Sequence, residues 1–187
     1  MNIVTAEKRN GITKSKALRR SGMVPCVICG STLSESLPIQ MEMMIANRMF
    51  KEKREGSTIQ IKVDEQIIPV QIKEKTWDFL KNELVHINFQ ALTANQKVNS
   101  ITHIILQNTD KVTGILEKVL LEIPYSAFPD NMIDTIAVDL DGLPVGASLT
   151  VGEISQFQND KIELQVSLDS LVFKINEKKH LSALEEE

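Results

Sequence analysis

The feature that most constrains the fold is a pair of alternating segments separated by a short polar turn. Residues 58–63 (TIQIKV) and 67–72 (IIPVQI) alternate apolar and polar side chains over most of their length, and Asp64, Glu65 and Gln66 lie between them. Period-two alternation is typical of a strand with one buried face, and two such runs around a short turn predict a β-hairpin. The first half of the chain must therefore build a sheet around this hairpin.

The rest of the first half supplies further strands and two helices. A short helix is expected at residues 14–21, with Thr13 as its N-cap and Gly22 as its stop, and an amphipathic helix at 41–54. Together these elements predict a small α/β unit with a mostly antiparallel, barrel-like sheet. Its remaining strands are expected at residues 2–6, as an edge strand, and at 24–30, 37–40 and 84–89.

Beyond a polar linker at residues 90–100, almost every segment has strand character. Strands at a spacing of roughly 8–15 residues, separated by turn residues, indicate an all-β domain. The fold class expected is therefore mainly β with a few helices: domain 1–91, an all-β domain 92–180 and an acidic tail 181–187. The strands of the second domain are expected at 101–106, 114–123, 135–140, 148–151 and 161–167.

Charge is distributed unevenly along the chain. The net charge is −4, but residues 1–90 hold 14 basic and 10 acidic side chains, and the remainder hold 7 and 15. Within residues 6–30 a single acid, Glu7, accompanies six cations. Concentrated positive charge on an acidic protein predicts a polyanionic partner. The six cations are Lys8, Arg9, Lys14, Lys16, Arg19 and Arg20.

Cys26 and Cys29 have the Cys-x-x-Cys spacing, but they lie inside an expected strand. Residues three apart on a strand point to opposite faces, whereas a metal or redox pair needs both thiols on one side. No second cysteine pair and no metal-like histidine spacing accompanies them. We interpret both as ordinary strand residues and expect no metal site and no cofactor.

The sequence gives no sign of catalysis. It has no nucleophile motif, glycine-rich phosphate loop or carboxylate cluster, so we expect no catalytic residues and no small-molecule substrate. No apolar run reaches the roughly 20 residues of a membrane-spanning helix, and no secretory signal begins the chain. We therefore expect a cytoplasmic protein with no membrane partner. The aromatic residues Trp77, Phe79 and Phe89 are more typical of a core than of a nucleobase-stacking platform.

His86 is flanked by Val85 and Ile87, so alternation predicts that it faces the other way, together with Leu84 and Asn88. Two interpretations remain open for this residue. The face is either an ordinary polar strand face or one that contacts a ligand.

Two motifs resemble a known family. Residues 11–30 (GITKSKALRRSGMVPCVICG) are similar to the opening motif of the bacterial ribosomal protein L-twenty-five / general stress protein CTC family, Gly-x-Gly-x-Ser-Arg-Arg-Leu-Arg-x-x-Gly-x-Val-Pro-Ala-Val-x-Tyr-Gly. Residues 81–90 (KNELVHINFQ) resemble its Lys-x-Glu-Ile-x-His-Val-Asp-Phe-Gln. A third region, residues 114–117, 128–140 and 145–146, is similar to the second domain of the longer CTC form.

The resemblance implies a large-subunit ribosomal protein that binds 5S ribosomal RNA through its N-terminal domain, while its second domain contacts neighbouring ribosomal components. Family positions that contact RNA match Arg9, Ser15, Lys16 and Arg19, and the strand facing the RNA matches His86 and Asn88. With the other helix cations, the expected RNA-binding residues are Arg9, Lys14, Ser15, Lys16, Arg19, Arg20, His86 and Asn88.

This chain also departs from the family pattern. Ala17 replaces a second arginine, Cys29 a tyrosine, and Asn88 an aspartate. Thr76 replaces a glutamine, and residues 77–79 (WDF) stand where the family has Arg-His-Pro. Lost cations predict weaker and less salt-dependent RNA binding, and Asp78 is expected to repel a phosphate. The alternative function is a stress-related protein-interaction module with residual RNA binding.

Overall fold

The computed structural model describes residues 3–30, 33 and 35–178. Within them the chain divides into two compact units, which are residues 3–101 with 126–134, and residues 102–125 with 135–178. The mainly β class expected from the sequence is confirmed, with a closed barrel in the first unit and further sheets in the C-terminal part.

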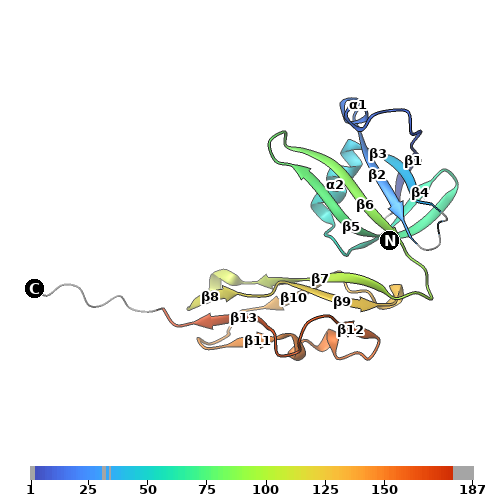
Figure 1. The fold of residues 1–187 in the computed structure, drawn as a ribbon. Helices are drawn as coiled ribbons and strands as arrows, with labels where there is room; N and C mark the ends of the chain where they lie inside the picture. The colour runs from blue at the N-terminus through green and yellow to red at the C-terminus, as the bar shows by residue number, and fades with distance from the viewer. Residues whose placement is uncertain (1–2, 31–32, 34, 179–187) are drawn as a thin grey trace, which may run out of the picture. The chain divides into compact units, whose positions relative to one another are not determined.

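A closed six-stranded barrel forms the first unit (Figure 1). Its strands follow the order β1-β3-β2-β6-β5-β4, and β4 pairs in turn with β1. The first strand is therefore no edge strand, because closure pairs it on both sides and removes exposed backbone edges. The bounds are β1 (Ile3–Lys8), β2 (Met23–Cys29), β3 (Leu37–Glu42), β4 (Thr58–Val63), β5 (Gln66–Asp78) and β6 (Glu83–Ala91).

Alternate side chains on these strands fill the barrel. Strand β4 shows the pattern that the sequence predicted, because Ile59, Ile61 and Val63 are buried. Lys62 between them is exposed. Burying an aliphatic side chain of this size contributes about 1.5–3 kcal/mol. The other strands add buried residues from each wall, including Val24, Ile28, Ile39, Met41, Val70, Ile72, Ile87 and Phe89.

The helix α2 (Met43–Glu52) packs against β2, β3 and β6. Its buried contacts come from Ala46 and Met49, and Phe50 stacks on Trp77 of β5 with ring centroids 4.8 Å apart. Lys75 of β5 donates to the carbonyl of Phe50 at 3.2 Å, near the end of the helix. A cation near the C-terminal carbonyls of a helix satisfies acceptors that the helix leaves unpaired.

A β-bulge interrupts the pairing of β5 with β6. Thr76 pairs with His86 and Trp77 pairs with Leu84, so Val85 has no opposite partner. An extra residue on one strand reverses the direction of the side chains beyond it. The prediction that Leu84 shares the polar face of His86 is therefore wrong, because Leu84 is fully buried.

The second unit holds most of two sheets. One has the order β10-β7-β9-β12 and the other β11-β13-β8. Ile123, Tyr125, Val172 and Ile175 are fully buried in it. The strands of these sheets are β7 (Val98–Gln107), β8 (Ile115–Lys118), β9 (Glu122–Ala127), β10 (Thr135–Asp139), β11 (Ser148–Thr150), β12 (Ile162–Leu164) and β13 (Leu171–Asn176). Short 3₁₀ helices occur in the second unit at Thr109–Lys111, Val151–Glu153 and Ser155–Phe157, and in the first unit at Pro129–Asn131.

Several expected element bounds are wrong. The linker predicted at 90–100 shrinks to 92–97, because Ala91 ends β6 and the buried Val98 begins β7. The second helix starts at Met43 rather than at residue 41, because Met41 belongs to β3 and the core. The strand expected at 114–123 is divided between β8 and β9, and β13 was not expected. The tail at 181–187 lies outside the described residues.

Two further expectations concern membranes and metals. Among the described helices, none combines the length and apolar character needed to cross a bilayer. Within the same part of the chain, no group of three or more metal-ligating side chains comes together.

Gly56, between α2 and β4, has less room for a side chain than any other glycine in the described part of the chain. Its φ is +87°, and a Cβ built there would overlap the carbonyl oxygen of Ile101. Gly22 has a similar φ of +81° but open space around it. We expect Gly22→Ala to lower the free energy of unfolding by about 1–3 kcal/mol from backbone strain, and Gly56→Ala to lower it further because of the overlap. Equal losses in urea titrations followed by circular dichroism would contradict this packing.

The two thiols should differ sharply in reactivity. Cys26 is buried and Cys29 is exposed, as the opposite-face argument predicted. Burial raises the pKa of Cys26 to about 12, so its reactive thiolate is scarce at neutral pH. We expect a thiol reagent to modify one cysteine rapidly in the native protein and both in denaturant. A Cys29→Ser variant should lose the rapid phase, and two rapid native thiols would contradict the placement of Cys26.

Candidate nucleic-acid interface

The short helix α1 (Ser15–Arg20) presents its cations because only one of its residues is buried. Leu18 anchors it to the barrel with 6% of its surface exposed. Gly22 takes a left-handed conformation after the helix, as predicted, and its carbonyl accepts from the backbone N–H of Met43 at 2.8 Å. The N-cap is Lys14 rather than the predicted Thr13, and its side chain makes no capping bond.

Three of the expected cations line one surface pocket of about 390 Å³. Lys16, Arg19 and Arg20 come from α1, Lys81 comes from the turn between β5 and β6, and Glu83 is the first residue of β6. Figure 1 shows α1 and the β5–β6 turn at the same end of the barrel. The pocket therefore collects four cations and one carboxylate from segments more than 60 residues apart in sequence. Neither Lys81 nor Glu83 was among the predicted site residues.

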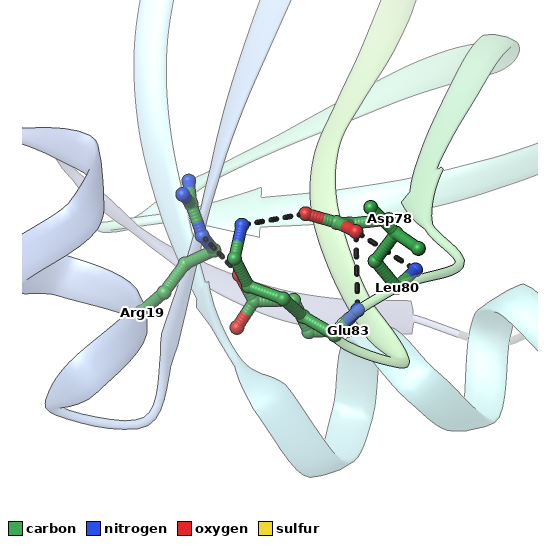
Figure 2. Close-up of polar contacts among 5 residues, drawn as sticks. Arg19, Asp78, Leu80 and Glu83 are labelled. Atoms are coloured by element: carbon green, nitrogen blue, oxygen red, sulfur yellow. Dashed lines mark hydrogen bonds and ion pairs between the residues drawn. The ribbon is translucent and has the colours of Figure 1, made fainter.

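Acidic side chains orient two of these cations (Figure 2). The Arg19 Nε donates to the Glu83 carboxylate at 3.3 Å, and that arginine side chain is only 16% exposed. The Lys81 Nζ donates to Asp78 at 2.7 Å. The hydrogen bond from Lys81 holds the pKa of Asp78 below its ordinary value, so this carboxylate stays charged. Asp78 is thus a partner of a pocket cation, whereas the sequence suggested only repulsion of phosphate.

A second cluster forms where the loop before α1 meets β6. The Arg9 guanidinium donates to the Thr13 carbonyl at 2.9 Å and to the Ser15 Oγ at 3.3 Å, which ties the loop to the start of the helix. On the neighbouring strands, Asn88 donates to the Glu74 carboxylate at 2.9 Å. These two residues are direct cross-strand partners.

His86 on β6 is half-buried, and the charges of Glu74 and Arg9 both act on it. Burial lowers the pKa of His86 below its ordinary value, the Glu74 carboxylate opposes this shift, and the Arg9 guanidinium adds to it. A lowered pKa keeps the imidazole neutral at pH 7, with one ring nitrogen as donor and the other as acceptor. His86 therefore offers hydrogen bonds rather than charge.

In the structure, three of the eight predicted residues line the pocket, four form the second cluster and one belongs to neither. Lys16, Arg19 and Arg20 share the pocket, while Arg9, Ser15, His86 and Asn88 surround the second cluster. Lys14 is exposed and lines neither. The sequence did not predict Glu74, Lys81 or Glu83 as site residues, because they lie far along the chain from the positively charged segment 6–30 and only folding brings them to it.

Two family models match the chain. The model described as "Ribosomal L25p family" matches residues 4–89, and that described as "Ribosomal protein TL5, C-terminal domain" matches residues 97–179. The first matched region contains all eight predicted site residues. The second begins after Ala91, where the last barrel strand, β6, ends.

Curated relatives extend over most of the chain. A Thermoanaerobacter protein named "Large ribosomal subunit protein bL25" is 24% identical, covering 87% of this chain and 82% of its own length. Proteins of the same name from Staphylococcus aureus and Syntrophomonas wolfei are each 28% identical. They cover 79% and 73% of this chain, and 69% and 68% of their own lengths.

The environment of His86 can be tested by proton NMR titration. We expect a His86 pKa below about 6.5, raised by Arg9→Gln because a cation is removed, and lowered by Glu74→Gln because a carboxylate is removed. A His86→Gln variant assigns the resonance.

As the pH falls, the imidazole of His86 takes up a proton in the unfolded protein before it does so in the folded protein. The stabilisation that His86 provides is therefore complete above pH about 6.5, and it decreases as the pH drops toward the pKa of the folded state. A measured pKa above 6.5, or no response to either substitution, would contradict the arrangement.

Proposed function

Because the chain belongs to the ribosomal L25p family, in its long form with a TL5-type C-terminal domain, we propose that it binds 5S ribosomal RNA within the large ribosomal subunit. The family and the names of its relatives support a large-subunit ribosomal protein with a structural, non-enzymatic role. Ribosome association in the cytoplasm follows from that role. The relatives reported above are all named as ribosomal, so the stress-related alternative gains no support from them.

The observation that carries the RNA-binding proposal is the convergence of cations at one end of the barrel. Lys16 and Arg20 are exposed on α1, and Lys81 joins them from the β6 side. Such a group neutralises phosphates and releases their counterions, which gives a salt-dependent affinity. Phosphate contacts of this kind position the protein on RNA without reading its sequence.

In this proposal the second cluster orients the RNA and selects its structure through hydrogen bonds. Ser15, neutral His86 and Asn88 supply hydrogen bonds along β6 and the start of α1, next to the charged pocket. A-form RNA has a deep, narrow major groove, so contacts of this kind suit the minor groove or a distorted internal loop. We therefore assign phosphate binding to the pocket and hydrogen-bond recognition to the His86–Asn88 segment.

In this proposal the two domains bind different partners. Residues 1–91 hold the RNA-binding surface, and residues 92–180 contact neighbouring large-subunit ribosomal proteins. The acidic excess beyond residue 90 supports this division, since it disfavours a polyanion and suits basic protein surfaces.

The charged pocket can be tested by titrating labelled 5S RNA at several salt concentrations. We expect Lys16→Gln and Arg20→Gln each to weaken binding and to reduce the slope of log affinity against log salt by about 1, because one phosphate contact is lost. Lys62→Gln is the matched control, since Lys62 is exposed on β4, across the barrel from β2.

Equal effects of all three substitutions would contradict the placement of the site. Equal affinity of the unsubstituted protein for 5S RNA and for an unrelated structured RNA of the same length would contradict 5S specificity.

A further inference from the structure

The turn between β5 and β6, residues 79–82, exposes two large apolar side chains in succession. Phe79 is 88% exposed and Leu80 is 99% exposed. The sequence suggested that Phe79 belongs to the core, and the structure corrects this. Turns usually carry glycine, asparagine, aspartate or serine. An aromatic and an aliphatic residue at this tip, with almost none of their surface buried, contribute nothing to the barrel core and call for another role.

Hydrogen bonds to Asp78 stabilise the turn at residues 79–82. The Asp78 carboxylate accepts from the backbone N–H of Leu80 at 3.0 Å, from that of Lys81 at 3.1 Å and from the Lys81 Nζ at 2.7 Å (Figure 2). Asn82 completes the turn in a left-handed conformation with φ +51°. These hydrogen bonds restrain the loop that carries Phe79, and a preorganised loop loses little conformational entropy when it binds.

The same tip contributes to the charged pocket. Lys81 is two residues from Phe79, so their Cα atoms are at most about 7.6 Å apart, and Lys81 lines the pocket with Lys16, Arg19 and Arg20. The exposed Phe79 is thus separated by only two residues along the chain from one of the cations that line the pocket. In a nucleotide the base and the phosphate are separated by a comparable, short distance.

We propose that this tip and pocket form a subsite for one unpaired RNA nucleotide, in which Lys16, Arg20 and Lys81 bind its phosphate and Phe79 stacks on its base. This inference rests on the proposed RNA binding and adds an apolar contact to it. Unstacked bases in RNA loops and bulges are commonly held on aromatic side chains. Stacking tolerates any base, because every base has a π-face.

Charge complementarity selects RNA over a protein partner. Four cations and one carboxylate, Glu83, line the pocket. Glu83 is bound to Arg19 and the neighbouring Asp78 to Lys81, which leaves the exposed cations Lys16 and Arg20 in excess. An apolar protein patch would cover Phe79 and Leu80 but would supply no anion for Lys16 and Arg20. A nucleotide satisfies both at once.

The test compares variants of the full chain in titrations with labelled 5S RNA. We expect Phe79→Ala to weaken binding about 10-fold or more, within the range for loss of one base stack, with the salt slope unchanged. Phe79→Tyr should bind like the unsubstituted protein because it keeps the ring, and Phe79→Leu should bind like Phe79→Ala. Unchanged thermal unfolding of each variant, expected for so exposed a side chain, excludes a folding defect.

Chemical probing of the RNA supplies the second readout. We expect one unpaired base to be protected by the unsubstituted protein and by Phe79→Tyr, but exposed with Phe79→Ala. Two results would overturn the subsite: Phe79→Ala binding within twofold of the unsubstituted protein, or Phe79→Leu retaining full affinity. Failure of the unsubstituted protein to bind 5S RNA would instead overturn the proposed function.

Discussion

The parallel pairing of β2 with β6 is the constraint on which the candidate site depends. Cys26 lies opposite Ile87 and Val27 opposite Asn88, with both strands running in the same direction. Since parallel neighbours begin at the same end of a sheet, the helix that precedes β2 and the turn that precedes β6 meet at one end of the barrel. The bond between Arg19 and Glu83, 64 residues apart, is the direct result.

Acidic residues shape this basic surface as much as the cations do. Glu83 holds Arg19, Asp78 holds Lys81, and Glu74 holds Asn88. Each acid lowers the local positive charge, yet each also fixes a donor in one direction. In the proposed RNA binding, donors that need little reorganisation on binding would offset part of the affinity expected to be lost where a cation of the family pattern is missing, as at Ala17.

The sequence predicted the elements whose signals are local. The alternation at 58–72 specified the β4–β5 hairpin, and the stop at Gly22 marked the end of α1, because hydrophobic period and backbone freedom act over a few residues. It missed the bulge at Val85, which depends on how β5 and β6 align. It also misplaced Phe79, because aromatic character alone cannot reveal whether a tip has a core to pack against.

The sequence by itself therefore determined the mainly β class, the family and the cations of the opening segment, since composition, period and motifs are properties of neighbouring residues. Tertiary structure alone decided which cations share a pocket, which face His86 occupies, that Lys81 and Glu83 line the pocket with α1, and that Phe79 is exposed. Those relations depend on barrel closure and on the β2–β6 register, which arise only when segments distant in the chain pair with one another.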